Sequence, residues 1–66
     1  MDYQRLFQRL ERETRQGDPP MTARDVATKF SCSESHARGV LGWMTSQNPP
    51  MMREVSGTKP KQWSRI

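Results

Sequence analysis

The chain has 66 residues, of which 32% are hydrophobic and 27% charged, and its formal net charge is +4. A chain this short forms a single domain, residues 1–66, and hides only about 60% of the surface of its unfolded state, which leaves no room for a deep active-site cleft and argues against an enzyme. Because Cys32 is the single cysteine and no apolar run approaches the roughly 20 residues that cross a bilayer, we expect an intracellular protein of the cytoplasm or nucleus without membrane contact.

A first helix is predicted from about Tyr3 to Gln16, followed by a break. Gly17 can adopt the left-handed conformation that ends a helix, and the two prolines after it prevent continuation. Met21 is then a candidate for a very short strand. One apolar stripe with the i, i+3, i+4, i+7 spacing defines the buried face of the helix, formed by Tyr3, Leu6, Phe7 and Leu10.

Two short helices joined by a tight turn are predicted next, the arrangement of a helix-turn-helix. Thr22 is the expected N-cap of the first, because its hydroxyl can accept a hydrogen bond from the amide of Asp25, and Ser33 caps the second in the same way. Cys32, at the turn, is expected to be a small buried apolar residue. The positions that a helix-turn-helix buries are apolar here, namely Val26, Ala27, Phe30, Ala37, Val40, Leu41 and Met44.

Gly39 and Gly42 lie inside the predicted third helix, where each costs about 1 kcal/mol relative to alanine. Two explanations stay open. In the structural one, the third helix packs closely against the first helix or simply tolerates the glycines. In the functional one, a side chain at these positions would obstruct the approach of a nucleic-acid backbone.

Asn48 and the two prolines after it end the third helix. The rest of the chain predicts a strand over residues 51–55, a turn over 56–60 and a second strand over 61–66. Three helices followed by a C-terminal β-hairpin wing define a winged helix-turn-helix fold of the α+β class.

The distribution of charge and the scarcity of reactive side chains point to binding rather than catalysis. His36 is the single histidine, there is no His/Cys cluster with metal-ligand spacing, and no glycine-rich loop follows a strand, so we expect no metal, cofactor or small-molecule substrate. Positive charge gathers near the C-terminus, where cations interleaved with Pro60 and Trp63 favour phosphate binding. Those cations are Arg53, Lys59, Lys61 and Arg65.

The candidate binding surface joins the third helix to the wing. Glu34, near the start of the helix, would repel phosphate, so we expect it to serve the helix dipole and face away. His36 is expected to be solvated or to contact phosphate, Trp43 to be partly buried against the wing, and Trp63 to be a core residue whose edge can reach a ligand. The predicted nucleic-acid-binding residues are Ser35, Arg38, Trp43, Thr58, Lys59, Pro60, Lys61 and Trp63.

With these residues the chain resembles one family over nearly its whole length, the Zα domains, which are winged-helix modules that bind left-handed Z-form DNA and RNA. The resemblance rests on three segments: Thr22-Ala23-x-Asp25-Val26-x-x-Lys29-Phe30, Val40-Leu41 and Gly57-Thr58-x-Pro60-x-x-Trp63. In that family an asparagine and a tyrosine of the third helix contact the backbone and a syn base. Here Arg38 and Gly42 stand at those positions, and Lys61 replaces the second proline of the wing.

The resemblance implies a non-catalytic domain that binds double-stranded DNA or RNA, converts an alternating CG duplex slowly or partially to the Z form, and can dimerise on the nucleic acid. It also implies a location in the host cell if the protein is viral. Two alternatives stay open. One is a regulator that inserts its third helix into the major groove of B-form DNA. The other is a protein-interaction module that uses the hairpin edge and exposed side chains of Met51 and Met52.

Overall fold

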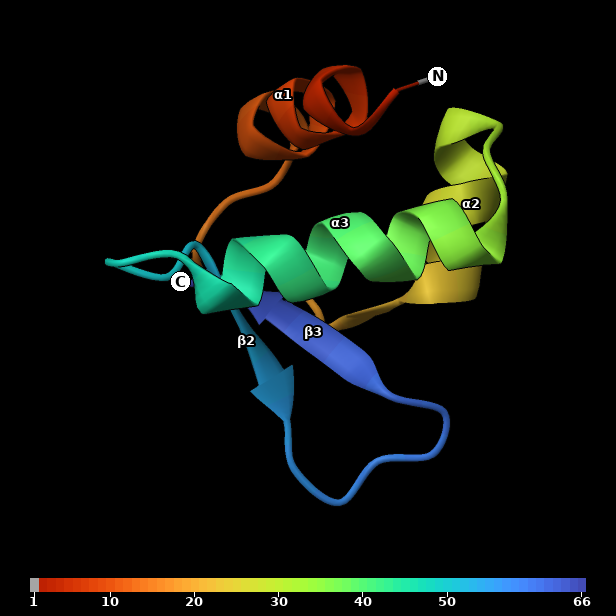
Figure 1. The fold of residues 1–66 in the computed structure, drawn as a ribbon. Coiled ribbons are helices and arrows are strands. Elements are labelled where there is room, and N and C mark those ends of the chain that lie inside the picture. The colour runs from red at the N-terminus through yellow and green to blue at the C-terminus, as the bar shows by residue number, and fades with distance from the viewer. Residues whose placement is uncertain (1) are drawn as a thin grey trace.

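The chain forms three helices and a three-stranded antiparallel sheet in a computed structural model that describes residues 2–66 (Figure 1). The α+β class predicted from the sequence is therefore confirmed. In chain order the elements are α1 (Tyr3–Glu13), β1 (Met21–Thr22), α2 (Ala23–Phe30), α3 (Glu34–Ser46), β2 (Met52–Val55) and β3 (Gln62–Arg65).

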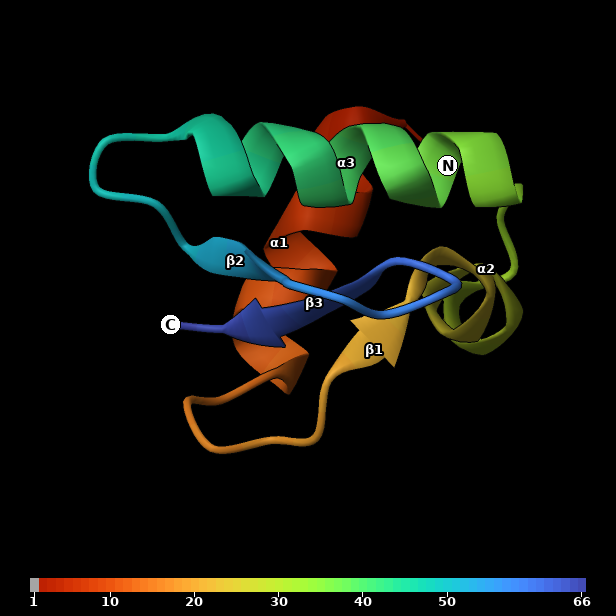
Figure 2. The ribbon, with the colours of Figure 1, turned by 90° about the horizontal axis from the view of Figure 1, so that it is seen from below.

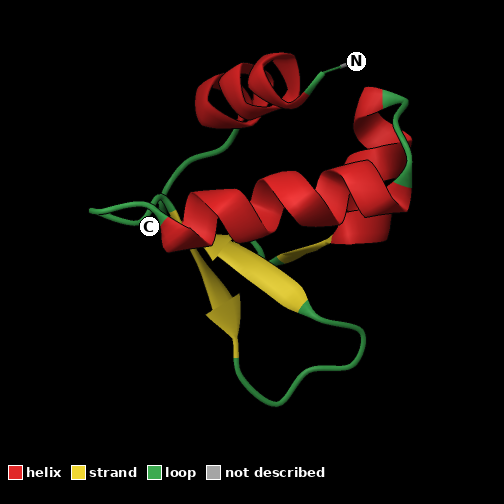
Figure 3. Cartoon of the chain, viewed as in Figure 1, coloured by secondary structure: helices red, strands yellow, loops and turns green. Residues whose placement is uncertain are grey.

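The sheet has the order β1-β3-β2, so the last strand of the chain is the central one (Figure 2). Trp63 of β3 lies opposite Met21 of β1 on one side and opposite Glu54 of β2 on the other. The very short strand expected at Met21 thus exists, and it ties the C-terminal hairpin to the segment that enters α2. The loop between β2 and β3 extends away from the helices (Figure 3).

Helix α1 ends at Glu13, earlier than the predicted end at Gln16. Thr14 is the C-cap: its backbone leaves the helical conformation (φ −118°, ψ 151°), while its amide still closes the last turn on the carbonyl of Leu10 at 3.0 Å. Gly17 has a φ of 96°, as its place in the predicted break requires. The N-terminus of the helix is capped by Asp2, whose carboxylate accepts from the amide of Arg5 at 2.8 Å.

The predicted caps of α2 and α3 are both confirmed. The hydroxyl of Thr22 accepts from the amide of Asp25 at 3.0 Å, and the Asp25 carboxylate accepts in return from the amide of Thr22 at 3.0 Å, which completes a capping box. Ser33 accepts from the amide of His36 at 3.0 Å. Cys32, at the turn, is half-buried and packs against the core rather than inside it.

The core lies around α3, which lies between α1 and the sheet in Figure 1. Met52 is completely buried and Met51 is half-buried against the core, so neither forms the exposed methionine patch on which the protein-interaction alternative depended. Tyr3 was expected in the buried stripe but is 52% exposed. The core residues are Leu6, Leu10, Ala23, Val26, Ala27, Phe30, Ala37, Val40, Leu41, Met44, Met52 and Trp63.

The two glycines of α3 have different surroundings. A Cβ added to Gly39 would lie 2.8 Å from Cζ of Tyr3 and still closer to its hydroxyl oxygen, whereas a Cβ added to Gly42 would meet nothing within 4 Å. Gly39 is therefore explained by close packing of α1 on α3. Gly42 is not required by any contact within the described chain.

This difference predicts opposite responses to alanine. We expect Gly42→Ala to raise the free energy of unfolding by about 0.5–1 kcal/mol, because alanine is the better helix former and no atom is displaced. Gly39→Ala should gain little or lose stability, since the Tyr3 ring must move off its contact with His36. Urea denaturation followed by circular dichroism measures both. The Tyr3→Ala background is the control, in which Gly39→Ala should recover its full gain; equal gains in the native background would contradict the packing explanation.

Candidate nucleic-acid interface

A groove of about 430 Å³ runs between the first half of α3 and the β2–β3 hairpin, and we call it the α3–hairpin groove. Side chains from the start of α2, from α3, from the hairpin loop and from β3 meet there, although they are far apart along the chain. The residues that line it are Ala23, Arg24, Glu34, Arg38, Pro60, Lys61 and Trp63.

Half of the predicted binding residues line this groove: Arg38, Pro60, Lys61 and Trp63. The other half do not. Ser35 is exposed on α3 next to the groove, and Lys59 is exposed in the hairpin loop. Thr58 is half-buried, and its hydroxyl donates to the carbonyl of Val55 at 3.1 Å, so its polar group stabilises the loop. Trp43 lies elsewhere on α3.

The groove carries an excess of positive charge that few neighbours neutralise. Arg24, Arg38 and Lys61 are all exposed. The described residues form two ion pairs, Arg9–Glu13 and Lys61–Glu54, so neither arginine of the groove is paired there. The Lys61–Glu54 pair spans 3.8 Å between side chains that are 66% and 48% exposed, and a surface pair of this kind contributes little. Lys61 can therefore exchange Glu54 for another anion.

Trp63 is only 4% exposed, which confirms its predicted place in the core. It borders the groove while most of the indole packs among buried side chains. Its main contribution to the interface is thus to hold β3, and with it the hairpin, against the helices.

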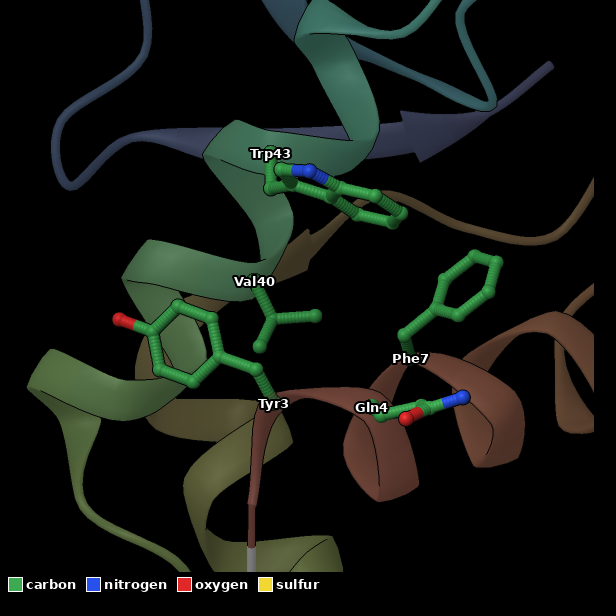
Figure 4. Close-up of a pocket in the computed structure, with 5 residues that line it drawn as sticks. All are labelled: Tyr3, Gln4, Phe7, Val40 and Trp43. Carbon is green, nitrogen blue, oxygen red and sulfur yellow. The ribbon is translucent and has the colours of Figure 1, made fainter.

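Trp43 lies on the side of α3 that faces α1, so the expectation that it packs against the wing is wrong. Its ring meets Phe7 edge-on, with centroids 4.9 Å apart, and 46% of the residue stays exposed. It lines a separate, largely apolar hollow of about 350 Å³ together with Tyr3, Gln4 and Val40 (Figure 4). Trp43 follows Arg38 by five helical positions, which turns the two side chains about 140° apart around the helix axis.

His36 also belongs to the α1 side of the helix. Its ring meets Tyr3 edge-on at 4.6 Å between centroids, and its Nε2 is buried without a hydrogen-bond partner among the described residues. His36 is therefore half-buried against Tyr3 rather than fully solvated, and its contact with phosphate stays a prediction.

Two groove residues differ from the sequence-based expectation. Glu34 lines the groove, so the prediction that it faces away is wrong. Arg24 was not predicted at all. Its place in the first turn of α2 could have suggested it, because the first helix of a helix-turn-helix crosses the nucleic-acid backbone.

Within residues 2–66, no group of three or more histidine, cysteine, aspartate or glutamate side chains is arranged to hold a metal ion. None of the helices described is long and apolar enough to cross a membrane.

Comparison of the chain with protein-family models, with curated proteins and with solved structures finds no match. The resemblance to Zα domains therefore rests on the three sequence segments alone.

Proposed function

We propose that the protein is a winged-helix module that binds double-stranded nucleic acid, without catalysis, through the α3–hairpin groove. The observation that carries this proposal is the meeting of Arg24, Arg38 and Lys61, from three separate parts of the chain, around one groove. Neither arginine has an ion-pair partner among residues 2–66. Clustered cations along a groove are the electrostatic footprint of phosphate binding.

The order of the elements supports the winged-helix assignment. Helices α2 and α3 are joined by the tight turn of residues 31–33, and the hairpin of β2 and β3 follows α3 directly. In such a module α3 is the recognition helix and the hairpin is the wing that grips the neighbouring backbone.

Each cation has a distinct role in this mechanism. Arg38, on the exposed face of α3, presents a planar guanidinium that can bind a phosphate or the O6 and N7 atoms of guanine. Arg24 at the start of α2 and Lys61 on the hairpin hold phosphates on the two sides of that contact. Lys59, exposed on the loop, extends the same basic surface.

The surroundings of the groove favour right-handed DNA as the ligand. Z-form recognition, as the family resemblance implies it, needs an aromatic side chain where Gly42 stands. Trp43 cannot replace it from the α1 side of the helix, and Trp63 is 4% exposed. Duplex RNA is disfavoured too, because its major groove is too deep and narrow to admit side chains.

The dependence of affinity on salt tests the proposal. If the groove neutralises about four phosphates, the logarithm of the association constant should fall against the logarithm of salt concentration with a slope of about −3 to −4. Lys59→Ala combined with Lys61→Ala should flatten that slope to about −2. Fluorescence anisotropy with a labelled duplex measures both.

The matched control removes two arginines from α1, on the other side of α3 from the hairpin (Figure 1). Arg5→Ala combined with Arg12→Ala changes the net charge equally and should leave the slope close to that of the native protein. Binding that is absent at low salt, or a slope that both double variants change alike, would contradict the proposal.

A further inference from the structure

Glu34 is the one acidic residue among the described residues that line the α3–hairpin groove. It is exposed, it stands at the first position of α3, and neither of the ion pairs in residues 2–66 includes it. Both oxygens of its carboxylate are therefore free to accept hydrogen bonds from a ligand. A carboxylate in a groove that otherwise attracts phosphate lowers the affinity of the protein for the nucleic-acid backbone. Its presence there therefore needs a chemical explanation.

The chemistry of a carboxylate restricts what it can meet on DNA. It has acceptors only, so it is repelled by phosphate oxygens and finds no partner at the N7 and O6 of guanine or the O4 of thymine. The donors in the major groove are the N4 amino group of cytosine and the N6 amino group of adenine. In adenine the neighbouring N7 is an acceptor that repels the second carboxylate oxygen, whereas the N4 of cytosine has only a C–H group beside it in the groove.

The position of Glu34 on α3 brings it to the bases. The first residues of a recognition helix are those that reach base edges in the major groove. Arg38 follows at i+4 on the same helix face, about 6 Å further along the axis. Glu34 supplies hydrogen-bond acceptors that match the amino group of cytosine. Arg38 beside it supplies donors that match the O6 and N7 atoms of guanine.

We propose that Glu34 is a specificity-determining residue that accepts a hydrogen bond from the N4 amino group of a cytosine in the major groove of duplex DNA, next to the contact of Arg38. This inference rests on the proposed function, and it identifies the ligand of the groove as a DNA site that contains a required cytosine.

The test compares the native protein with Glu34→Ala and Glu34→Gln. A preferred site is first selected from a randomised DNA duplex library, and each position of it is then replaced by the other three base pairs for anisotropy titrations. The native protein should prefer cytosine at one position by about ten-fold. Glu34→Ala should lose that preference and bind the other duplexes more tightly, because the repulsion of phosphate is gone.

Glu34→Gln gives the sharper result. Glutamine has an acceptor and a donor, which suit the N6 and N7 atoms of adenine, so the preference at that position should change from cytosine to adenine. Glu11→Gln, an exposed change of equal charge on α1, is the control and should leave every base preference as it is. Circular dichroism verifies that each variant is folded.

The outcomes separate the two proposals. If the native protein binds duplexes but Glu34→Ala tightens all of them equally, with base preferences unchanged, Glu34 only adjusts the charge of the groove and this inference is overturned. A native protein with no preference for cytosine overturns it as well. If no duplex is bound at low salt, the proposed function itself fails.

Discussion

Trp63→Ala is expected to lower the free energy of unfolding by about 3–5 kcal/mol. Trp63 is 4% exposed and lies on the central strand, opposite Met21 and Glu54, so its loss leaves a cavity where the sheet meets the helices. Small domains are stable by only about 5–15 kcal/mol, and a loss of this size removes a large share of that margin. Urea or thermal denaturation followed by circular dichroism measures it.

Trp43→Ala is the matched control, because it removes the same side chain from the same molecule at a site that is 46% exposed. It should cost about 1 kcal/mol, chiefly the edge-on contact with Phe7, and leave duplex affinity unchanged. Trp63→Phe should keep most of the stability and most of the binding, since a large ring still fills the core. Equal destabilisation by Trp43→Ala and Trp63→Ala would contradict the burial that distinguishes the two residues.

Local features of the fold were predictable from the sequence because their causes lie within a few residues. Thr22 and Asp25 form a capping box three positions apart, and Ser33 caps α3 by the same chemistry. The apolar spacing of α2 and α3 identified their buried faces for the same reason. The strand at Met21 was expected for its position between the break and the cap, and it found its partner in β3.

The candidate site was predicted only in part, because its geometry depends on how distant elements pack. Nothing near Trp43 or His36 in the sequence reveals that α1 crosses α3 on their side, where Phe7 and Tyr3 meet their rings. Glu34 was misplaced for a related reason. A residue at the start of a helix satisfies the dipole whichever way it points, so only the position of the hairpin shows that it borders the groove.

An alternating CG duplex of DNA is expected to keep its right-handed circular dichroism spectrum when the native protein saturates it. The resemblance to Zα domains implied slow or partial conversion, because Gly42 stands at the position of the family's tyrosine. Trp43, the neighbouring aromatic residue, packs on Phe7 on the α1 side of α3 and cannot supply the missing ring. A protein shifts the equilibrium between two DNA conformations only if it binds one of them more tightly. A shift from 1:99 to 99:1 needs affinities for the two forms that differ by a factor of about 10⁴.

Gly42→Tyr turns this expectation into a gain-of-function experiment. A Cβ added to the half-buried Gly42 would meet nothing within 4 Å among the described residues, so a side chain can start there without displacing a neighbour. If the resemblance to Zα domains extends to binding, this variant should invert part of the CG spectrum, whereas Gly42→Leu, of similar helix compatibility but without an aromatic ring, should not. Adding Arg38→Ala to Gly42→Tyr should reduce the inversion, because the backbone contact beside the ring is lost. Inversion by the native protein would contradict the preference for right-handed DNA and make Z-form recognition the function of the groove.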